Sequence, residues 1–167
     1  MAELEHWFAG RAEYENFGLA LASDTESFVG HLGKARELTK RAVDSAIQAD
    51  RKETGAIWQA IAAQREAAFG IAGEARPLAA EALKLAPASQ GAKAEAALAF
   101  AVAGDAARAE SLAQDLGRRF PLDTQMQSLW LPAIQAQLEL NQNNHRHVPI
   151  HEIREAAASG GSRPPLS

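Results

Sequence analysis

The chain has 167 residues, of which 38 are alanine and none is cysteine. This length suits about one domain with a sizeable core, and the absence of cysteine excludes disulfides, thiolate chemistry and Cys-ligated metals. Lys and Arg total 17 against 21 Asp and Glu, a net charge of −4 without a long basic run, so we expect no nucleic-acid partner.

The opening segment, MAELEHWFAG, carries acids where a signal peptide needs a basic stretch followed by an apolar run. No part of the chain approaches about 18 uninterrupted apolar residues, the length that a membrane-spanning helix needs. We therefore expect a cytoplasmic protein that has no membrane partner.

Helical periodicity runs along most of the chain, and strand patterns are almost absent. In chain order, the expected helices cover 13–31, 33–49, 53–69, 73–86, 90–103, 105–119 and 124–141. Ser23 with Glu26 resembles a capping box and predicts a break in the first helix, whereas Thr124 with Gln127 predicts the start of the last one. Pro132 predicts a kink in that last helix or an adjustment of its start.

Three glycines, Gly30, Gly70 and Gly104, mark an internal repeat with spacings of 40 and 34 residues. Each glycine is followed by an alanine five residues later and by an apolar residue twelve residues later, and two units end in a proline seventeen residues after the glycine. Small residues let antiparallel helices cross closely, and proline stops a helix. The predicted packing positions are Ala35, Ala75, Ala109, Ala42, Ala82, Leu116, Pro87 and Pro121.

The segments GIAGEARPLAAEALKLAP (70–87) and GDAARAESLAQDLGRRFP (104–121) resemble the second helix of a tetratricopeptide repeat (TPR), a helix–turn–helix unit. This resemblance implies an all-α fold, a right-handed α-α superhelix (TPR-like solenoid) of about three to three and a half helical hairpins. We expect this domain to cover residues 1–142, with its first helix poorly defined before residue 13, and residues 143–167 to form a disordered or aberrant tail.

A closer resemblance is to repeat arrays that follow the catalytic domain in some bacterial serine/threonine protein kinases. It is carried by GHLGKARELTKRAVDSA (30–46), KETGAIWQAIAAQREAAFG (52–70) and RRFPLDTQMQSLWLPAIQA (118–136). The chain itself has no G-x-G-x-x-G loop, no H-R-D motif followed by Asn and no D-F-G motif. The resemblance therefore implies a noncatalytic fragment of a larger bacterial signalling protein, without a cofactor.

In such a superhelix, the first helices of successive hairpins line a concave groove that holds a peptide or a helix. The groove residues that the resemblance implies are Asp24, Phe28, Ala60, Gln64, Ala68, Leu98 and Val102. The Lys, Arg and Asn residues that clamp a terminal carboxylate in the best-known version of this groove are missing from these positions. The predicted partner is therefore a hydrophobic or helical segment.

The cluster His145, His147, His151 and Glu152 has ligand types that bind divalent metals. Asn141 to Asn144 and SGGSRPPLS surround it with loop-forming residues, and a metal site needs rigid support. We therefore expect a tail here and no metal site.

The last predicted helix carries Leu129, Trp130, Leu131, Ile134, Leu138 and Leu140 without a following partner helix. Exposed apolar patches favour association, which predicts self-association through residues 126–140 that Leu138→Glu weakens. Trp130 and Trp58 are expected to pack within or between repeats rather than to form an exposed hot spot.

Three function hypotheses remain open at this point. The first is a noncatalytic protein–protein interaction scaffold of unknown partner, which is favoured by the repeats and by the missing kinase motifs. The alternative is a regulatory, ligand-sensing helical-repeat domain of a kinase or transcription factor, in which a small molecule occupies the concavity. The third is a metal-dependent enzyme built on the histidine cluster.

Overall fold

The computed structural model describes residues 14–146, which form seven α-helices and contain no strand. The helices are α2 (Glu15–Phe28), α3 (Leu32–Gln48), α4 (Lys52–Ala68), α5 (Ala72–Leu85), α6 (Gln90–Val102), α7 (Ala106–Arg119) and α8 (Leu131–Arg146). The predicted all-α class is confirmed, and the middle five helices begin and end within a residue or so of their expected bounds.

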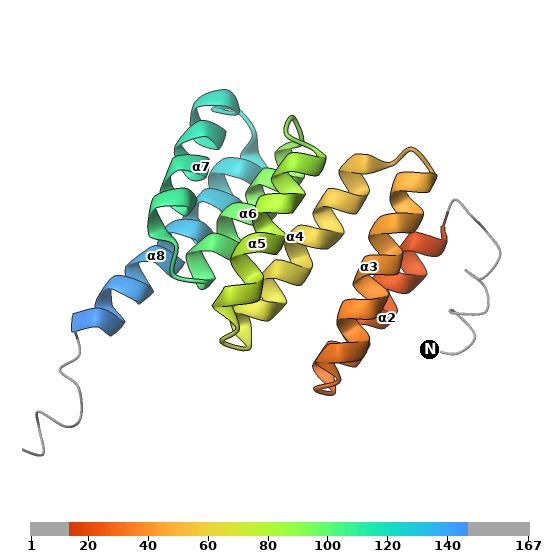
Figure 1. The fold of residues 1–167 in the computed structure, drawn as a ribbon. Coiled ribbons are helices and arrows are strands. Elements are labelled where there is room, and N and C mark those ends of the chain that lie inside the picture. The colour runs from red at the N-terminus through yellow and green to blue at the C-terminus, as the bar shows by residue number, and fades with distance from the viewer. Residues whose placement is uncertain (1–13, 147–167) are drawn as a thin grey trace, which may run out of the picture.

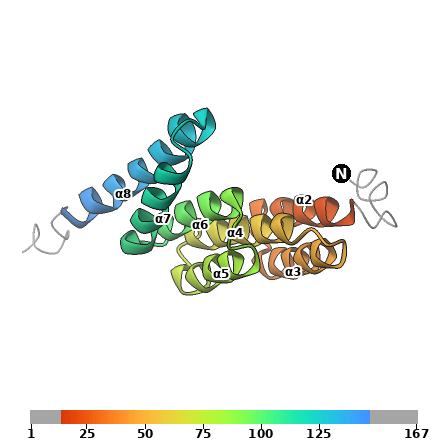
Figure 2. The ribbon, with the colours of Figure 1, turned by 90° about the horizontal axis from the view of Figure 1, so that it is seen from above.

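The helices pack in chain order as antiparallel pairs, α2 with α3, α4 with α5 and α6 with α7, followed by α8 (Figure 1). Viewed from above, α2, α4 and α6 lie in one row and α3 and α5 in a second, while α7 and α8 lie at an angle to both rows (Figure 2). Helix α4 contacts α3, α5 and α6, and α8 contacts α6 and α7. Within residues 14–146, no helix is long and apolar enough to cross a membrane.

The three aligned glycines each end the first helix of a pair. Gly30, Gly70 and Gly104 have φ values of 87°, 79° and 74°, a left-handed conformation that costs a residue with a Cβ about 1–2 kcal/mol. At the second of these turns, the Gly70 N–H donates to the Ala67 carbonyl at 2.9 Å and the Ile71 N–H donates to the Glu66 carbonyl at 2.8 Å. This is the Schellman arrangement, so the repeat seen in the sequence is a repeat of helix ends.

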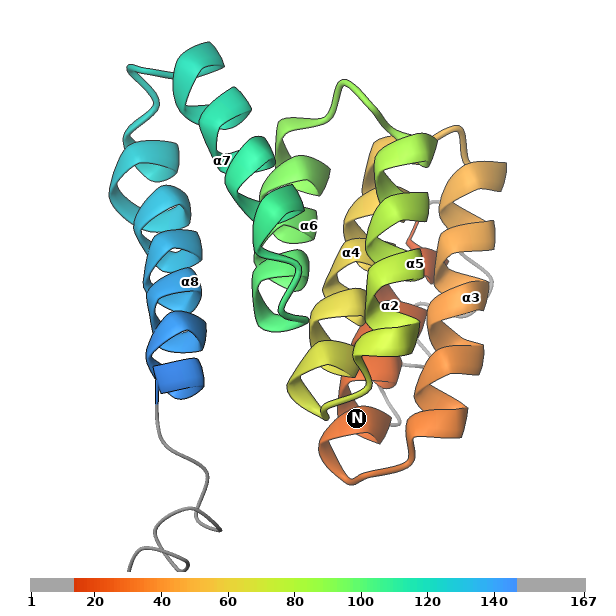
Figure 3. The ribbon, with the colours of Figure 1, turned by 60° about the vertical axis from the view of Figure 1, so that its left-hand side comes forward.

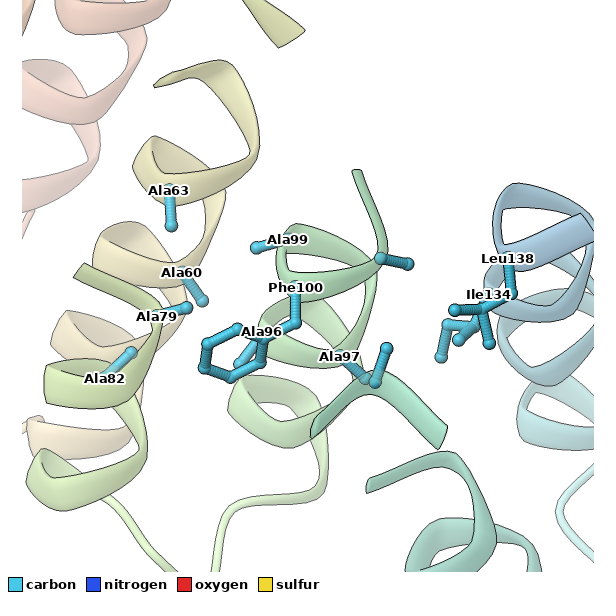
Figure 4. Close-up of a cluster of buried hydrophobic side chains, with 12 residues drawn as sticks. Ala60, Ala63, Ala79, Ala82, Ala96, Ala97, Ala99, Phe100, Ile134 and Leu138 are labelled. Atoms are coloured by element: carbon cyan, nitrogen blue, oxygen red, sulfur yellow. The ribbon is translucent and has the colours of Figure 1, made fainter. Parts of the chain in front are cut away.

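The main core is built mostly from alanine (Figure 4). Ala60 and Ala63 of α4, Ala79 of α5 and Ala96 of α6 are all fully buried, and Phe100 is the large side chain among them. The predicted packing residues Ala35, Ala75, Ala109, Ala42, Ala82 and Leu116 are all buried, whereas Pro87 and Pro121 are exposed just beyond the ends of α5 and α7. Small side chains at the crossings let these helices approach closely.

The predicted break in the first helix is wrong. Helix α2 is continuous from Glu15 to Phe28, and Ser23 is buried within it. The Ser23 hydroxyl donates to the Ala35 carbonyl at 2.7 Å and lies 2.8 Å from the Thr39 hydroxyl. Ser23 therefore joins two helices and does not begin one.

The start of the last helix is also corrected. Asp123, not Thr124, caps it, because the Asp123 carboxylate accepts from the Met126 N–H at 2.8 Å. The hydrogen bond from the Gln90 side chain, together with that from the Met126 N–H, lowers the pKa of Asp123. A π-helical turn, η1 (Met126–Trp130), comes before α8, and Pro132 lies in the first turn of α8. The predicted adjustment before Pro132 is confirmed, since proline cannot donate the hydrogen bond that a regular helix would need there.

Fewer apolar side chains of the last helix are exposed to solvent than the sequence predicts. Ile134 and Leu138 are buried against α6, with 0% and 8% of their surface exposed. Leu129 and Leu140 remain more than half exposed. Leu138→Glu would place a charge in the core, so it cannot serve as a surface probe of self-association.

The glycine turns give a stability prediction. Gly70→Ala should lower the free energy of unfolding by about 1 kcal/mol, because φ is 79° there although no atom lies within 4 Å of the added Cβ. Gly73→Ala is the matched control, since Gly73 lies in α5 with equally open surroundings and should gain about 0.5 kcal/mol. Urea denaturation measures both, and a shift of the two variants in the same direction would contradict the left-handed turn.

Candidate functional site

The first two helix pairs are joined by charged side chains. Arg65 of α4 donates to the Thr39 hydroxyl at 2.7 Å and to the Ser23 hydroxyl at 2.9 Å, and it also pairs with Asp24. This arginine therefore joins α4 to both α2 and α3. Its contacts are structural.

A second charged contact joins α3 to α4. The Arg36 guanidinium donates to both carboxylate oxygens of Glu66 at 2.7 Å, and the Glu66 side chain is 7% exposed. The hydrogen bonds and charge of Glu66 raise the pKa of Arg36. Bidentate pairs of this kind are geometrically selective, so this contact holds α3 and α4 in one relative position.

The two tryptophans within the described residues contribute to packing. The Trp58 indole N–H donates to Asn16 at 3.2 Å, and the Trp58 ring meets the Phe17 ring edge-on with centroids 5.5 Å apart. Trp130 is partly buried against the cluster of Ala94, Leu116 and Met126. Trp7 lies outside the described residues.

The groove residues inferred from the TPR resemblance do not form one accessible surface. Ala60 is fully buried, so the assignment of this residue to a ligand-facing position is wrong. Asp24 pairs with Arg65, and the Gln64 amide donates to the side chain and carbonyl of Glu95 on α6. Phe28 and Ala68 are exposed, while Leu98 and Val102 are partly buried. Side chains that join one helix pair to the next thus occupy part of the predicted groove.

Helices α7 and α8 lie side by side at one end of the helix row (Figure 3). An open cavity is lined by residues of these two helices. Its volume is about 470 Å³, and it is lined by Glu110, Ala113, Gln114, Leu131, Ile134, Gln135, Leu138, Glu139 and Gln142. We call it the α7/α8 groove. Ile134 and Leu138 are apolar and buried, whereas Glu110 and Glu139 are exposed. Among the described residues, neither carboxylate has an ion-pair partner.

Sequence reasoning missed the α7/α8 groove, although a signal for it existed. Arg36 and Arg76 occupy the position six residues after Gly30 and Gly70, and Glu110 occupies the same position after Gly104. Arg36 binds Glu66, and Arg76 donates to the Ala103 carbonyl at 2.7 Å, so both arginines contact the next helix pair. Glu110 lies in α7, and among the described residues it does not make the contact with a following helix that the two arginines make.

A second cavity of about 360 Å³ lies between α3, α4 and α5. It is lined by Arg36, Thr39, Lys40, Val43, Asp44, Gln59, Ala62, Arg65, Glu66, Leu78 and Glu81. Both signs of charge are present, and α5 supplies a third wall through Leu78 and Glu81. We call it the α3/α4/α5 cavity.

Side chains are described for residues 14–143. No group of three or more His, Cys, Asp or Glu side chains in this part of the chain is placed to hold a metal ion. His31 makes an exposed contact with Glu26 at 2.8 Å. His147, His151 and Glu152 lie outside the described residues, as does the side chain of His145.

Comparisons with protein-family models, curated proteins and solved structures find no match for this chain. The helices, their contacts and the two cavities are therefore the observations on which a functional interpretation rests. Of these, the α7/α8 groove has the largest volume and exposed charges that no ion pair within the described residues neutralises.

The α4–α6 contact gives a pH prediction. Burial raises the pKa of Glu95 above its ordinary value of 4.5, and the hydrogen bond from Gln64 opposes this shift only in part. A raised pKa in the folded state means that stability is greatest when Glu95 is protonated and falls as the pH rises through that pKa. Glu95→Gln should therefore flatten the decrease in unfolding free energy that sets in above the ordinary pKa of 4.5 and continues as the pH rises through the raised pKa.

Urea denaturation at intervals across that range measures the slope. Glu37→Gln is the control, because Glu37 is exposed on α3 and pairs only with Lys34 at 3.2 Å. Equal slopes for Glu95→Gln and the unmodified chain would contradict the pKa shift of Glu95.

Proposed function

We propose that this chain is a noncatalytic protein-interaction module that binds a helical segment of a partner in the α7/α8 groove. The module is a TPR-like right-handed superhelix, and the succession of antiparallel pairs with matching glycine turns supports this description. The resemblance to repeat arrays of bacterial kinases supports a place within a larger cytoplasmic signalling protein. The helical-repeat fold by itself does not choose among functions.

The observation that carries the proposal is the composition of the α7/α8 groove. Its floor is apolar at Leu131, Ile134 and Leu138, and its rim is polar at Gln114, Gln135 and Gln142. Amphipathic helices bind in grooves of this type, with apolar side chains at i, i+3, i+4 and i+7 on the floor and polar ones at the rim. The small side chain of Ala113 leaves room on the α7 side.

A library of amphipathic helical peptides, displayed on yeast and selected against the full chain, tests the proposal. Enriched peptides should lose at least about tenfold in affinity for Gln135→Trp, because the indole fills a groove that Gln135 lines from an exposed position. Gln48→Trp is the matched control, since Gln48 is exposed at the end of α3 and lines neither cavity. Circular dichroism establishes that both variants remain helical.

Failure to enrich any helix would contradict the proposed function. Enriched helices that bind Gln135→Trp as tightly as Gln48→Trp would contradict the α7/α8 groove as their site. Helices that instead depend on Phe28 or Leu98 would return the site to the surface predicted from the sequence.

A second candidate function is ligand sensing, which the α3/α4/α5 cavity favours. Its volume of about 360 Å³ falls within the usual range for small-molecule sites, and its charges suit a zwitterionic metabolite. Such a ligand at 100 times its Kd should raise the free energy of unfolding by about 2.7 kcal/mol.

A thermal-shift screen of zwitterionic metabolites measures this effect. Lys40→Glu should abolish the shift, because Lys40 lines the cavity and is exposed, whereas Lys52→Glu at the exposed start of α4 should leave it unchanged. The absence of any shift across the set would count against a sensor.

A further inference from the structure

The α7/α8 groove and the α3/α4/α5 cavity occupy equivalent places in the repeat. Arg36, Thr39 and Lys40 line the α3/α4/α5 cavity, at six, nine and ten residues after Gly30. Glu110, Ala113 and Gln114 line the α7/α8 groove at the same three distances from Gly104. The register of the glycine turns therefore allows a residue-by-residue comparison.

The two sites differ in their third wall. In the α3/α4/α5 cavity, α5 lies beside the other two helices, and its Glu81 accepts from the Gln59 amide at 2.8 Å. The α7/α8 groove is lined by α7 and α8 alone, and no helix follows α8 within the described residues. A helix bound along the α7/α8 groove would therefore supply the third wall that α5 supplies in the α3/α4/α5 cavity.

The charge at one of the equivalent positions is inverted, since Arg36 corresponds to Glu110, whereas Lys40 corresponds to the neutral Gln114. Arg36 and Lys40 line the α3/α4/α5 cavity from α3, where Arg36 binds Glu66 of α4, and Glu81 lines the cavity from α5. The wall of the α7/α8 groove carries Glu110 instead, and Glu139 adds a second carboxylate from α8. A completing helix that presents cations is then favoured over one that presents carboxylates, because Glu110 and Glu139 attract cations and repel like charges.

The cations nearest along α7 are already engaged. Arg108 pairs with Asp105 at 3.3 Å and stacks over Phe100, and Arg119 pairs with Asp115 at 2.8 Å. Arg118 donates to the Gln114 carbonyl at 3.3 Å and forms no ion pair within the described residues. No residue that lines the α7/α8 groove is basic. The two carboxylates are thus not neutralised by these arginines.

From this comparison, we propose that the partner is a cationic amphipathic helix of another protein. Its apolar stripe packs on Ile134 and Leu138, and its Lys or Arg side chains pair with Glu110 and Glu139. This inference rests on the proposed function and specifies the charge of the ligand.

The test uses fluorescence polarisation of the full chain with three labelled peptides of about 18 residues, long enough to form a helix. They share one apolar stripe and differ at the flanking positions, which are all Lys, all Gln or all Glu. The Lys peptide should bind at least about tenfold tighter than the Glu peptide. The double variant Glu110→Gln/Glu139→Gln should weaken the Lys peptide about fivefold and leave the Gln peptide unchanged.

The control double variant is Glu37→Gln/Glu74→Gln, which removes two exposed carboxylates from α3 and α5 and changes the net charge equally. It should leave the affinity for the Lys peptide unchanged.

Equal loss in both double variants would show a nonspecific charge effect and overturn the proposal. Equal affinities for the Lys and Glu peptides, both lost in Gln135→Trp, would preserve the proposed function and overturn only the cationic partner. Binding of no peptide would overturn both.

Two other occupants are distinguished by further measurements on the full chain. A disulfide that forms within single chains of Gln114→Cys/Ala157→Cys would place the chain's own C-terminal segment on the groove and overturn the proposal. Sedimentation that shows a dimer of the unmodified chain but a monomer of Gln135→Trp would assign the groove to a second copy, with the same consequence. A monomer in both cases, together with selective binding of the Lys peptide, supports the cationic helix.

Discussion

Close crossing of helices through alanine is the constraint on which this structure depends. At the junction of α4, α5 and α6, the buried side chains are nearly all single methyl groups, with Phe100 as the large exception. Each methyl group contributes little apolar area, at about 0.8 kcal/mol per buried carbon. The advantage of alanine is the short distance between helix axes, which brings many backbone atoms into contact. Larger residues at these crossings would separate the pairs.

Alanine surfaces are smooth, so they select the relative position of two helices only weakly. Polar contacts between the pairs are more selective, because they need particular donors and acceptors. Arg36 with Glu66 joins α3 to α4, Gln64 with Glu95 joins α4 to α6, and Asn141 donates to the Ala101 carbonyl at 2.6 Å between α8 and α6. In this repeat, the apolar alanine layer determines the distance between helix axes, and the polar contacts determine how the helices are aligned along one another.

This division explains which features could be predicted from the sequence. Helix periodicity, glycine at helix ends and small residues at crossings are local or repeated signals, and the structure places them as expected at Gly70, Ala75 and Ala82. Ser23 was misinterpreted because its partner, the Ala35 carbonyl, lies twelve residues away on another helix. The contact of Gln64 with Glu95 was not predicted for the same reason, since a single sequence cannot show that two side chains on different helix pairs meet.

The position six residues after each turn glycine has different contacts in the three helix pairs. Arg36 and Arg76 at this position contact the next helix pair, so their side chains are used in building the array. Glu110 has no ion-pair or hydrogen-bond partner among the described residues, and α8 meets α6 through Ile134 and Leu138. Within the described residues, Glu110 makes neither the hydrogen bond nor the ion pair that its equivalents make, so replacing it should cost the fold little. An array of this kind can therefore acquire a charged binding surface at its end by changing single residues, because the alanine core behind them stays the same.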